Sequence, residues 1–345
     1  MDSFTGVAIV AEFGSKFKGF WIDEIEANER LTHLLLSREI TVDDAENISN
    51  FMNNGYLIIP KAISEELADQ LRNEMANVHL SPGKFIVRTQ QKNYSYATSE
   101  ALQDNQFRLI DFHVNSQLAR AAIFSAPIVR FIELIFQKPL LAFQSLTFKS
   151  GSQQAIHQDG AYVVLSEALQ FVASWIALED VEEGSGELIY YPGSHRFADF
   201  LFSEKYKHWQ LERDGKEQHQ TFLKHLHDEA KRRGITLSKF LPKKGDALIW
   251  AADLAHGGSK IDKPHATRHS LVTHYCPSGI EPNYCNFSGT FFKQSAAVEN
   301  CFYSARHYDL RPKQKAVFDY SSNSLQNELL NPAKDIIQQI EANTF

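Results

Sequence analysis

Three side chains of this sequence have the types and the order of a metal site: His157, Asp159 and His256. Two imidazoles and one carboxylate can hold a single Fe(II) ion while leaving coordination positions open for oxygen chemistry. In a strand, residues i and i+2 point to the same face, so His157 and Asp159 can reach one ion while Gln158 turns away. His256 follows an apolar run and precedes two glycines, a position typical of a strand end. The pattern therefore predicts one mononuclear site built from two distant segments.

A single His-x-Asp tripeptide is weak evidence, because a chain with 14 histidines is expected to contain about one such tripeptide by chance. A second match occurs at His307-Tyr308-Asp309. It has no histidine downstream and no strand-like segment after it, so we expect it to be coincidental. His274 and His265 remain alternatives to His256 as the distal ligand.

A carboxylate clamp is predicted twelve residues beyond His256, at Arg268 and Ser270. In a strand these two side chains share one face, opposite His269. Arginine can grip a carboxylate with two parallel hydrogen bonds, and the serine can add a hydroxyl donor. An iron site beside such a clamp suggests a dicarboxylic co-substrate. 2-Oxoglutarate would chelate the iron through its C1 carboxylate and keto oxygen while its far carboxylate meets Arg268, and O2 would take the remaining position.

The segments that must position these residues are short and rich in β-forming side chains. From residue 140 the sequence alternates apolar runs with Gly, Pro, Ser and Asp, and no long helical pattern appears before about residue 217. Many short strands separated by turn signals predict a jelly roll or sandwich, whereas a parallel sheet would need alternating helices. The predicted strands are 56–59, 140–148, 170–178, 187–191, 247–251 and 268–276, and the predicted helices are 64–78, 115–123, 127–136 and 217–233.

A polar insertion at about 197–244 interrupts the predicted β region. Between residues 201 and 244 it carries eleven Lys/Arg and six Asp/Glu, a balance of +5 in a chain whose net charge is −7. One interpretation is a solvated helical face. The other is a lid or rim that attracts an anionic substrate group. The sequence leaves both open.

The composition argues against several classes of protein. With 35 basic and 42 acidic residues, the chain is not expected to bind nucleic acid or anionic membranes in general. Cys276, Cys285 and Cys301 are odd in number and form no Cys-x-x-Cys pair, so neither a disulfide framework nor a zinc ribbon is expected. The N-terminal segment lacks a basic start followed by a long apolar run, and the last three residues are no peroxisomal signal. We therefore expect a soluble, cytoplasmic protein.

Five further segments occur in one order along the chain: HQDGAYV (157–163), Trp175, GELIYYPGSHR (186–196), GDALIWAADLAHGG (245–258) and TRHS (267–270). Together with residues 51–75, they resemble the phytanoyl-CoA dioxygenase family of Fe(II)- and 2-oxoglutarate-dependent oxygenases. The resemblance implies a mainly β fold with flanking helices around a double-stranded β-helix, or jelly-roll, core. The oxygenase domain would span 47–276, with an N-terminal extension at 1–46 and a C-terminal extension at 277–345 packed on the core.

The resemblance also implies roles for individual residues. His157, Asp159 and His256, which we call the triad, would bind the iron and carry the catalytic chemistry. Arg268 would anchor 2-oxoglutarate. The remaining candidates for contacts to 2-oxoglutarate are Ser270, Trp175, Thr147 and Gln144.

The expected reaction is hydroxylation of an unactivated C–H bond, with release of succinate and CO2. The carboxylate of Asp159 argues against halogenation, because related halogenases carry a small residue at that position. The substrate would be a small molecule or an acyl thioester, and the basic insertion favours an anionic one. The alternatives are a cupin-like Zn(II) hydrolase or isomerase and a non-catalytic binding protein of the same fold, and the oligomeric state stays open. Side chains expected to meet the substrate are Tyr162, Phe107, Arg108 and Asp111.

Overall fold

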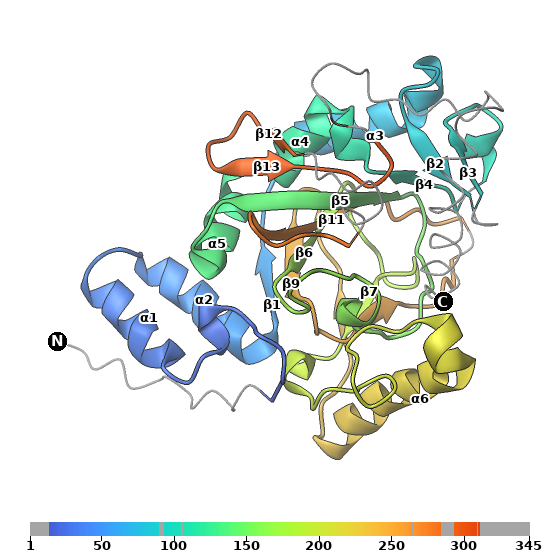
Figure 1. Cartoon of the computed structure of the whole chain (residues 1–345). Coiled ribbons are helices and arrows are strands. Elements are labelled where there is room, and N and C mark those ends of the chain that lie inside the picture. Colours follow the sequence, from blue (N-terminus) through green and yellow to red (C-terminus); the bar gives the residue numbers. More distant parts are fainter. Residues whose placement is uncertain are drawn as a thin grey trace.

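The structure, a computed structural model, describes residues 14–89, 93–104, 106–263, 265–283, 293–308 and 310 (Figure 1). Its strands are β1 (Tyr56–Ile59), β2 (Ile86–Arg88), β3 (Tyr94–Tyr96), β4 (Arg108–Ile110), β5 (Leu140–Phe148), β6 (Val172–Ala177), β7 (Leu188–Tyr190), β8 (Ser238–Phe240), β9 (Ala247–Ala251), β10 (His256–Gly258), β11 (Ser270–Pro277), β12 (Gln294–Ser295) and β13 (Cys301–Tyr303). Its helices are α1 (Ala27–Leu36), α2 (Val42–Asn54), α3 (Glu65–Asn77), α4 (Gln117–Ile123), α5 (Ala126–Phe136) and α6 (Leu211–Arg232).

Two sheets form the centre of the molecule. The main path of the larger sheet runs β1-β9-β6-β11-β5-β4-β2-β3, and β13 pairs with β5 outside that path. The smaller sheet has the order β10-β7-β8. One buried cluster combines Trp175 and Trp250 of the larger sheet with Leu188, Tyr190 and Phe240 of the smaller one. The two sheets therefore share a core between them, in the mainly β architecture that the sequence predicted.

Helices α1 to α5 pack with the larger sheet in the main hydrophobic core. In Figure 1, α1 and α2 lie together on one side of the molecule, with α3 and α4 above β5. Phe51 of α2 meets Phe131 of α5 edge to face, with ring centroids 5.2 Å apart. The N-terminal half of the chain thus supports the larger sheet, whose strands β5 and β6 carry Gln144 and Trp175 of the predicted site.

Local sequence explains where α2 begins and ends and why β1 follows it directly. The Thr41 hydroxyl accepts from Asp44 N at 3.1 Å, and the Asp44 carboxylate accepts from Thr41 N at 2.9 Å, which forms a capping box. The helix ends at Gly55, whose φ of 76° suits a residue without a Cβ. Tyr56 then starts β1, which pairs antiparallel with β9.

Most long strands lie where the sequence placed them. β1, β5 and β9 match their predicted bounds, and β6, β7 and β11 begin within two residues of theirs. β2, β3 and β4 were not predicted, because three residues are too few to show an alternating pattern. These three short strands extend the larger sheet beyond β5.

The insertion is helical, as predicted, but its helix α6 starts earlier than residue 217. Gly215 interrupts it with a non-helical backbone (φ 68°, ψ 174°), so the first turn is a separate piece. α6 lies on the opposite side of the molecule from α3 and α4 (Figure 1). None of the helices in the described part of the chain combines the length and apolar character of a membrane span.

Candidate active site

The triad residues are all buried and meet at one point. His157 Nε2 lies 3.6 Å from Asp159 Oδ1, and His256 Nε2 lies 3.8 Å from the same oxygen. One candidate ligand atom from each residue lies within 4.8 Å of the other two. Among the described residues this is the one group of His, Cys, Asp or Glu arranged in this way. Two nitrogens and one oxygen at this spacing fit a single iron ion with open positions.

A backbone bridge holds the two histidines opposite each other. His157 N donates to His256 O, and His256 N donates to His157 O, each at 2.8 Å. Gly257, the next residue, packs so tightly that a Cβ there would lie 2.7 Å from Gln154 O. The glycine therefore permits the close approach of the two segments that carry the ligands.

The Nδ1 hydrogen bonds of both imidazoles direct the lone pair of each ring to Nε2, and in His157 that atom accepts from Gln154 Nε2 at 3.2 Å, a contact that a bound metal would replace. His157 Nδ1 lies 2.8 Å from Ala155 O, and His256 Nδ1 lies 2.9 Å from Leu254 O. A carbonyl oxygen can only accept, so Nδ1 carries the proton in each ring and Nε2 presents a lone pair. Burial lowers the pKa of His256 to about 4, despite the nearby charge of Asp159. The neutral form that binds metals is therefore the stable one at neutral pH.

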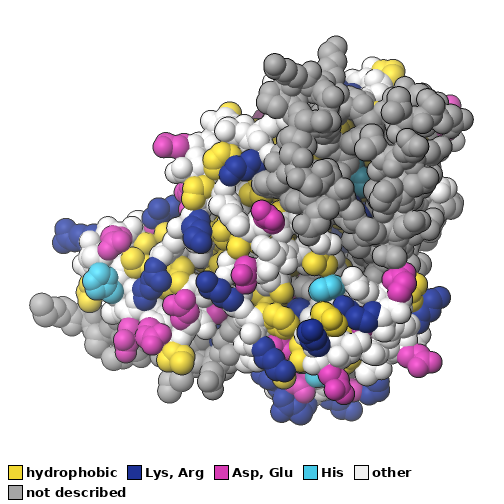
Figure 2. Space-filling model, viewed as in Figure 1, with side chains coloured by type: hydrophobic (Ala, Val, Ile, Leu, Met, Phe, Trp, Pro, Cys, Tyr) yellow, Lys and Arg dark blue, Asp and Glu magenta, His cyan; other side chains and the backbone are white. Residues whose placement is uncertain are grey.

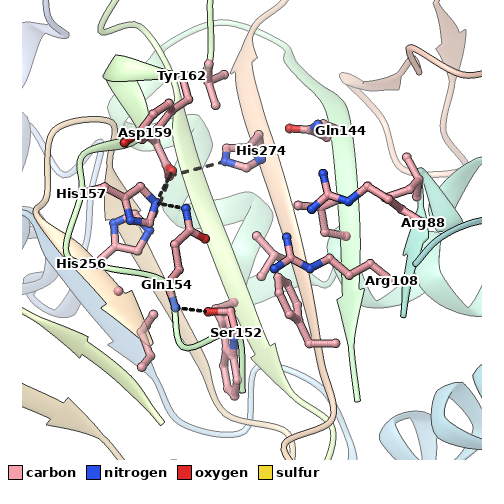
Figure 3. A pocket seen from close by; sticks show the side chains of 18 of the residues that line it. Arg88, Arg108, Gln144, Ser152, Gln154, His157, Asp159, Tyr162, His256 and His274 are labelled. Atoms are coloured by element: carbon pink, nitrogen blue, oxygen red, sulfur yellow. Dashed lines mark hydrogen bonds and ion pairs between the residues drawn. The ribbon is translucent and has the colours of Figure 1, made fainter. Parts of the chain in front are cut away.

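A hydrogen bond from Trp250 orients the carboxylate of Asp159. Trp250 Nε1 donates to Asp159 Oδ2 at 2.9 Å, which leaves Oδ1 facing the two histidines. His274 Nε2 also lies near Oδ2, at 3.4 Å. Burial alone would raise the pKa of Asp159, but His256, His157 and His274 hold it well below its usual value. The group is therefore an anion ready to bind a cation (Figure 3).

Buried donors surround the predicted carboxylate clamp. Arg268 is 2% exposed, and its Nη1 donates to Gly186 O at 2.8 Å. Its Nε, together with Trp175 Nε1 and Ser270 Oγ, has no hydrogen-bond partner within the described part of the chain. A buried donor without a partner costs about 1–3 kcal/mol. A carboxylate bound here would satisfy such donors, so these residues fit the far end of 2-oxoglutarate.

A cavity of about 150 Å³ connects the triad with Arg268. Its lining includes eight of the predicted site residues: His157, Asp159, His256, Arg268, Trp175, Gln144, Tyr162 and Arg108. Four others do not line it: Ser270, Thr147, Phe107 and Asp111. Thr147 accepts from Leu109 N at 3.1 Å and so ties β5 to β4, while Phe107 is packed in the main core.

Asp111 organises the wall of the cavity from behind. Its carboxylate accepts from Ser145 N (3.2 Å), Arg306 N (3.1 Å) and His307 N (3.4 Å). Its backbone is left-handed, with φ 49°. Burial raises the pKa of Asp111 to about 6, against these hydrogen bonds and the charge of Arg306. Asp111 thus fixes the segment after β13 against β5, and that segment supplies Arg306 and His307 to the cavity.

The sequence did not identify several cavity residues, and most of these come from short strands, from the loop before His157 or from the segment after β13. His307, from the dismissed second His-x-Asp match, lines the cavity and stacks on Tyr94 with ring centroids 5.1 Å apart. Asp309 lies outside the described residues. His274 lines the cavity beside Asp159, whereas His265 is exposed. No local sequence signal joins residues so far apart in the chain. Other polar or aromatic lining residues missed include Arg88, Tyr94, Gln154, Trp250 and Arg306.

The basic insertion touches the site through one side chain. Tyr162 lies beside His157 (ring centroids 5.5 Å), and its hydroxyl is 2.6 Å from His219 of α6. None of the Lys or Arg side chains of 201–244, all within the described residues, lines the cavity. Most are paired with acids, as in Lys207 with Asp253, Arg213 with Asp214, Lys224 with Asp228, Arg232 with Glu229, Lys243 with Asp180 and Lys244 with Asp69. Basic and acidic side chains are also intermingled on this part of the surface (Figure 2), which favours a solvated face over an anion-attracting rim.

Curated proteins resemble this chain over about three quarters of its length. Phytanoyl-CoA dioxygenase, peroxisomal, of Bos taurus is 20% identical over 263 residues, which cover 74% of each chain. The Homo sapiens protein of the same name is 20% identical over 270 residues, covering 74% of this chain and 76% of its own.

Solved structures share the fold. The non-heme alpha ketoglutarate dependent carbocyclase SnoK from nogalamycin biosynthesis superposes with a TM-score of 0.53 at 16% identity, covering 77% of this chain and 96% of its own. EctD from S. alaskensis, solved with bound Fe, gives a TM-score of 0.50 at 15% identity, covering 69% and 77%. The predicted fold class, mainly β with a jelly-roll core, is confirmed.

The model of the family Phytanoyl-CoA dioxygenase (PhyH) matches residues 51–270. This range contains the triad and Arg268 and covers more than half of the 345 residues. The enzyme class predicted from the sequence, a 2-oxoglutarate-dependent dioxygenase, is thereby confirmed. The protein belongs to the phytanoyl-CoA dioxygenase family.

Proposed function

We propose that the protein uses Fe(II), 2-oxoglutarate and O2 to hydroxylate an unactivated C–H bond of a small-molecule or acyl substrate. Family membership supports the use of iron and 2-oxoglutarate. The observation that carries the proposal is the triad itself, in which two lone pairs and one carboxylate oxygen face a common point. Bound there, Fe(II) with 2-oxoglutarate and O2 supplies the oxidant, and 2-oxoglutarate leaves as succinate and CO2.

The residues of the triad are held so that they would bind a metal from a fixed direction. The carbonyls of Ala155 and Leu254 keep the Nδ1–H of each histidine occupied, and Trp250 holds the outer oxygen of Asp159. Such supporting hydrogen bonds orient the ligands and raise their basicity. Because Asp159 remains anionic, its carboxylate would occupy a coordination position of a bound iron, which supports hydroxylation over halogenation.

The co-substrate would lie between the triad and Arg268. Arg268 Nε and Trp175 Nε1, both from residues that line the cavity, provide donors for its far carboxylate. A cupin-like Zn(II) hydrolase or isomerase would leave these buried donors without a partner, so their presence supports the oxygenase. Apolar side chains of β4, β5 and β11 also line the cavity and limit the access of water to the reaction: Ile110, Leu146 and Val272.

The substrate would approach along the wall formed by Tyr162 and the short strands β2 to β4. Burial raises the pKa of Tyr162 above its ordinary value, so the hydroxyl stays neutral and keeps its contact with His219. The domain limits at residues 46 and 276 and the cytoplasmic location stay predictions.

Anaerobic absorbance spectroscopy tests the proposed cofactors. Adding Fe(II) and then 2-oxoglutarate to the wild-type protein is expected to produce a visible metal-to-ligand charge-transfer absorption. Asp159→Ala is expected to abolish the absorption because an iron ligand is lost. A wild-type protein that binds Fe(II) without gaining this absorption would contradict the proposal, and Zn(II) bound at the same site would give none.

A further inference from the structure

Two arginines face the triad from the opposite wall of the cavity. Arg88 of β2 and Arg108 of β4 are direct cross-strand partners in an antiparallel ladder. Both line the cavity, and their guanidinium groups point toward the triad side, with Gln144 of β5 nearby (Figure 3). Neither strand shows a signal in the sequence, so the pairing appears only in the fold.

Like charges placed directly opposite each other destabilise a sheet. Burial lowers the pKa of Arg108 to about 9, and the positive charges of Arg88 and Arg268 act in the same direction. No carboxylate within the described part of the chain forms an ion pair with Arg108. Its guanidinium instead lies 4.6 Å from the centre of the Phe148 ring. This arrangement costs free energy that a bound anion would offset.

Arginines outnumber carboxylates among the described residues that line the cavity. Four arginines line it (Arg88, Arg108, Arg268 and Arg306), whereas Asp159 is the one carboxylate among the lining residues that the structure describes. Asp111 lies just behind the wall, where its charge acts on that of Arg306. Fe(II) and the 2-oxoglutarate dianion would cancel each other, so their binding would bring no net counter-charge to Arg108.

2-Oxoglutarate does not account for Arg88 and Arg108 as well. Its far carboxylate fits Arg268, beside the unpartnered Trp175 Nε1. The guanidinium of Arg268 is 5.5 Å from the Phe148 ring, which Arg108 also contacts. The ring therefore adjoins two distinct cationic groups, one on β4 and one at the start of β11.

We propose that Arg88 and Arg108 form a second anion subsite, which holds a carboxylate or phosphate group of the primary substrate while its reactive carbon faces the triad. The inference rests on the proposed function, because it concerns the substrate of that same reaction. Two guanidinium forks from neighbouring strands can grip one oxyanion with several charge-assisted hydrogen bonds. In this proposal the arginine pair makes the substrate site selective for anions, and the basic insertion at 197–244 does not contribute to that selectivity. Arg88 and Arg108 are substrate-positioning residues.

Calorimetric titration of the anaerobic protein loaded with Fe(II) and 2-oxoglutarate tests the subsite with two matched pairs of probes. Hexanoate and hexanamide differ in charge at nearly constant shape, and hexyl phosphate with hexanol tests the phosphate arm. The wild-type complex is expected to bind at least one anion tenfold or more tightly than its neutral partner. Arg88→Gln and Arg108→Gln are expected to reduce that preference to less than threefold.

Opposite effects of two variants separate this subsite from the co-substrate clamp. Arg108→Gln should weaken the anionic probe more than 2-oxoglutarate, whereas Arg268→Gln should weaken 2-oxoglutarate more than the probe. Arg38→Gln, an exposed change of the same kind, should alter neither affinity. The subsite would be overturned if wild type bound the anionic and neutral probes of both pairs equally, or if the preference survived both substitutions. It would also be overturned if Arg108→Gln weakened 2-oxoglutarate binding more than probe binding. The charge-transfer absorption reports the proposed function, so the two proposals can fail separately.

Discussion

His157 and His256 are joined by two reciprocal backbone hydrogen bonds of 2.8 Å, so the first and last ligands of the triad are cross-strand neighbours. Their rings lie 4.5 Å apart between centroids. The segments that carry them are far apart in sequence, yet a short bridge sets the separation of the two ligand nitrogens. The affinity for iron should therefore depend on the backbone packing around this bridge.

Gly257→Ala tests that dependence. The added methyl group would lie 2.7 Å from Gln154 O and 3.1 Å from Ala155 O, so the bridge must shift. We expect Fe(II) affinity to fall by roughly tenfold or more, measured by competition with a metal chelator. Gly14→Ala is the control, because its nearest heavy atom is 4.0 Å away and the change should leave Fe(II) affinity as it is. Unchanged affinity in Gly257→Ala would show that the bridge does not set the ligand geometry.

Trp250→Phe removes the hydrogen bond that orients Asp159 while keeping an aromatic ring beside His256. Loss of a supporting partner of a metal ligand typically costs about 10–100-fold in metal affinity or activity, and we expect a loss in that range. Trp21→Phe is a matched control, since its Nε1 donates to Leu134 O at 3.0 Å, in a part of the core outside the cavity lining. Both variants should lose stability, but only Trp250→Phe should weaken iron binding. Equal Fe(II) affinities of the two variants would refute the role given to Trp250.

Arg268→Ala should separate co-substrate binding from metal binding. Truncating one partner of a buried charge pair costs roughly 2–5 kcal/mol, so the 2-oxoglutarate concentration needed for half-maximal turnover should rise at least about thirtyfold. Iron should still bind, because no triad residue contacts the guanidinium through a hydrogen bond in the described structure. Titrating 2-oxoglutarate against iron-loaded variant and wild type measures the effect. An unchanged requirement for 2-oxoglutarate would contradict the role of Arg268 in binding the far carboxylate.

The raised pKa of Asp111 predicts that the stability of the protein depends on pH. Burial raises its pKa in the fold to about 6, above the ordinary value of 3.8, so the folded state holds its proton more tightly than the unfolded state. The contribution of this residue is fully present below the unfolded pKa and is lost as the pH rises through the folded one. Between pH 5 and pH 7.5 the stability of wild type relative to Asp111→Asn should therefore fall, by on the order of 1 kcal/mol.

Urea unfolding of both proteins at the two pH values measures this difference. Asp43→Asn, at an exposed position on α2, serves as the matched control and should show no comparable change. A wild-type protein that gains stability relative to Asp111→Asn between pH 5 and pH 7.5 would be inconsistent with a buried carboxyl of raised pKa.

The sequence predicted the elements whose signal is local. β5 and β9 are long enough to show their apolar pattern, and the His-x-Asp motif, the distal histidine and Arg268 occur at recognisable spacings. The cavity wall opposite the triad could not be predicted from local patterns in the sequence. β2 and β4 have three residues each, and Arg88 and Arg108 become neighbours only through strand pairing.

Two features gained a place once the chain was folded. His307, from the second His-x-Asp match, is no part of the triad, but Asp111 holds its backbone at the cavity wall. Of the two interpretations left open for the insertion, the structure favours the solvated face, because acids pair with Lys243, Lys244 and others. Pairing of charges in space is a property of the fold, which a count along the sequence does not reveal.

Succinate formation from 2-oxoglutarate is the most direct test of the central claim, that the triad and Arg268 form the site of an Fe(II)- and 2-oxoglutarate-dependent oxygenase. The assay compares wild type and His157→Ala, with and without Fe(II) and O2. Wild type is expected to form succinate only when both are present, and His157→Ala should fall to the background rate. Succinate formed without iron, or at the wild-type rate by His157→Ala, would contradict the account.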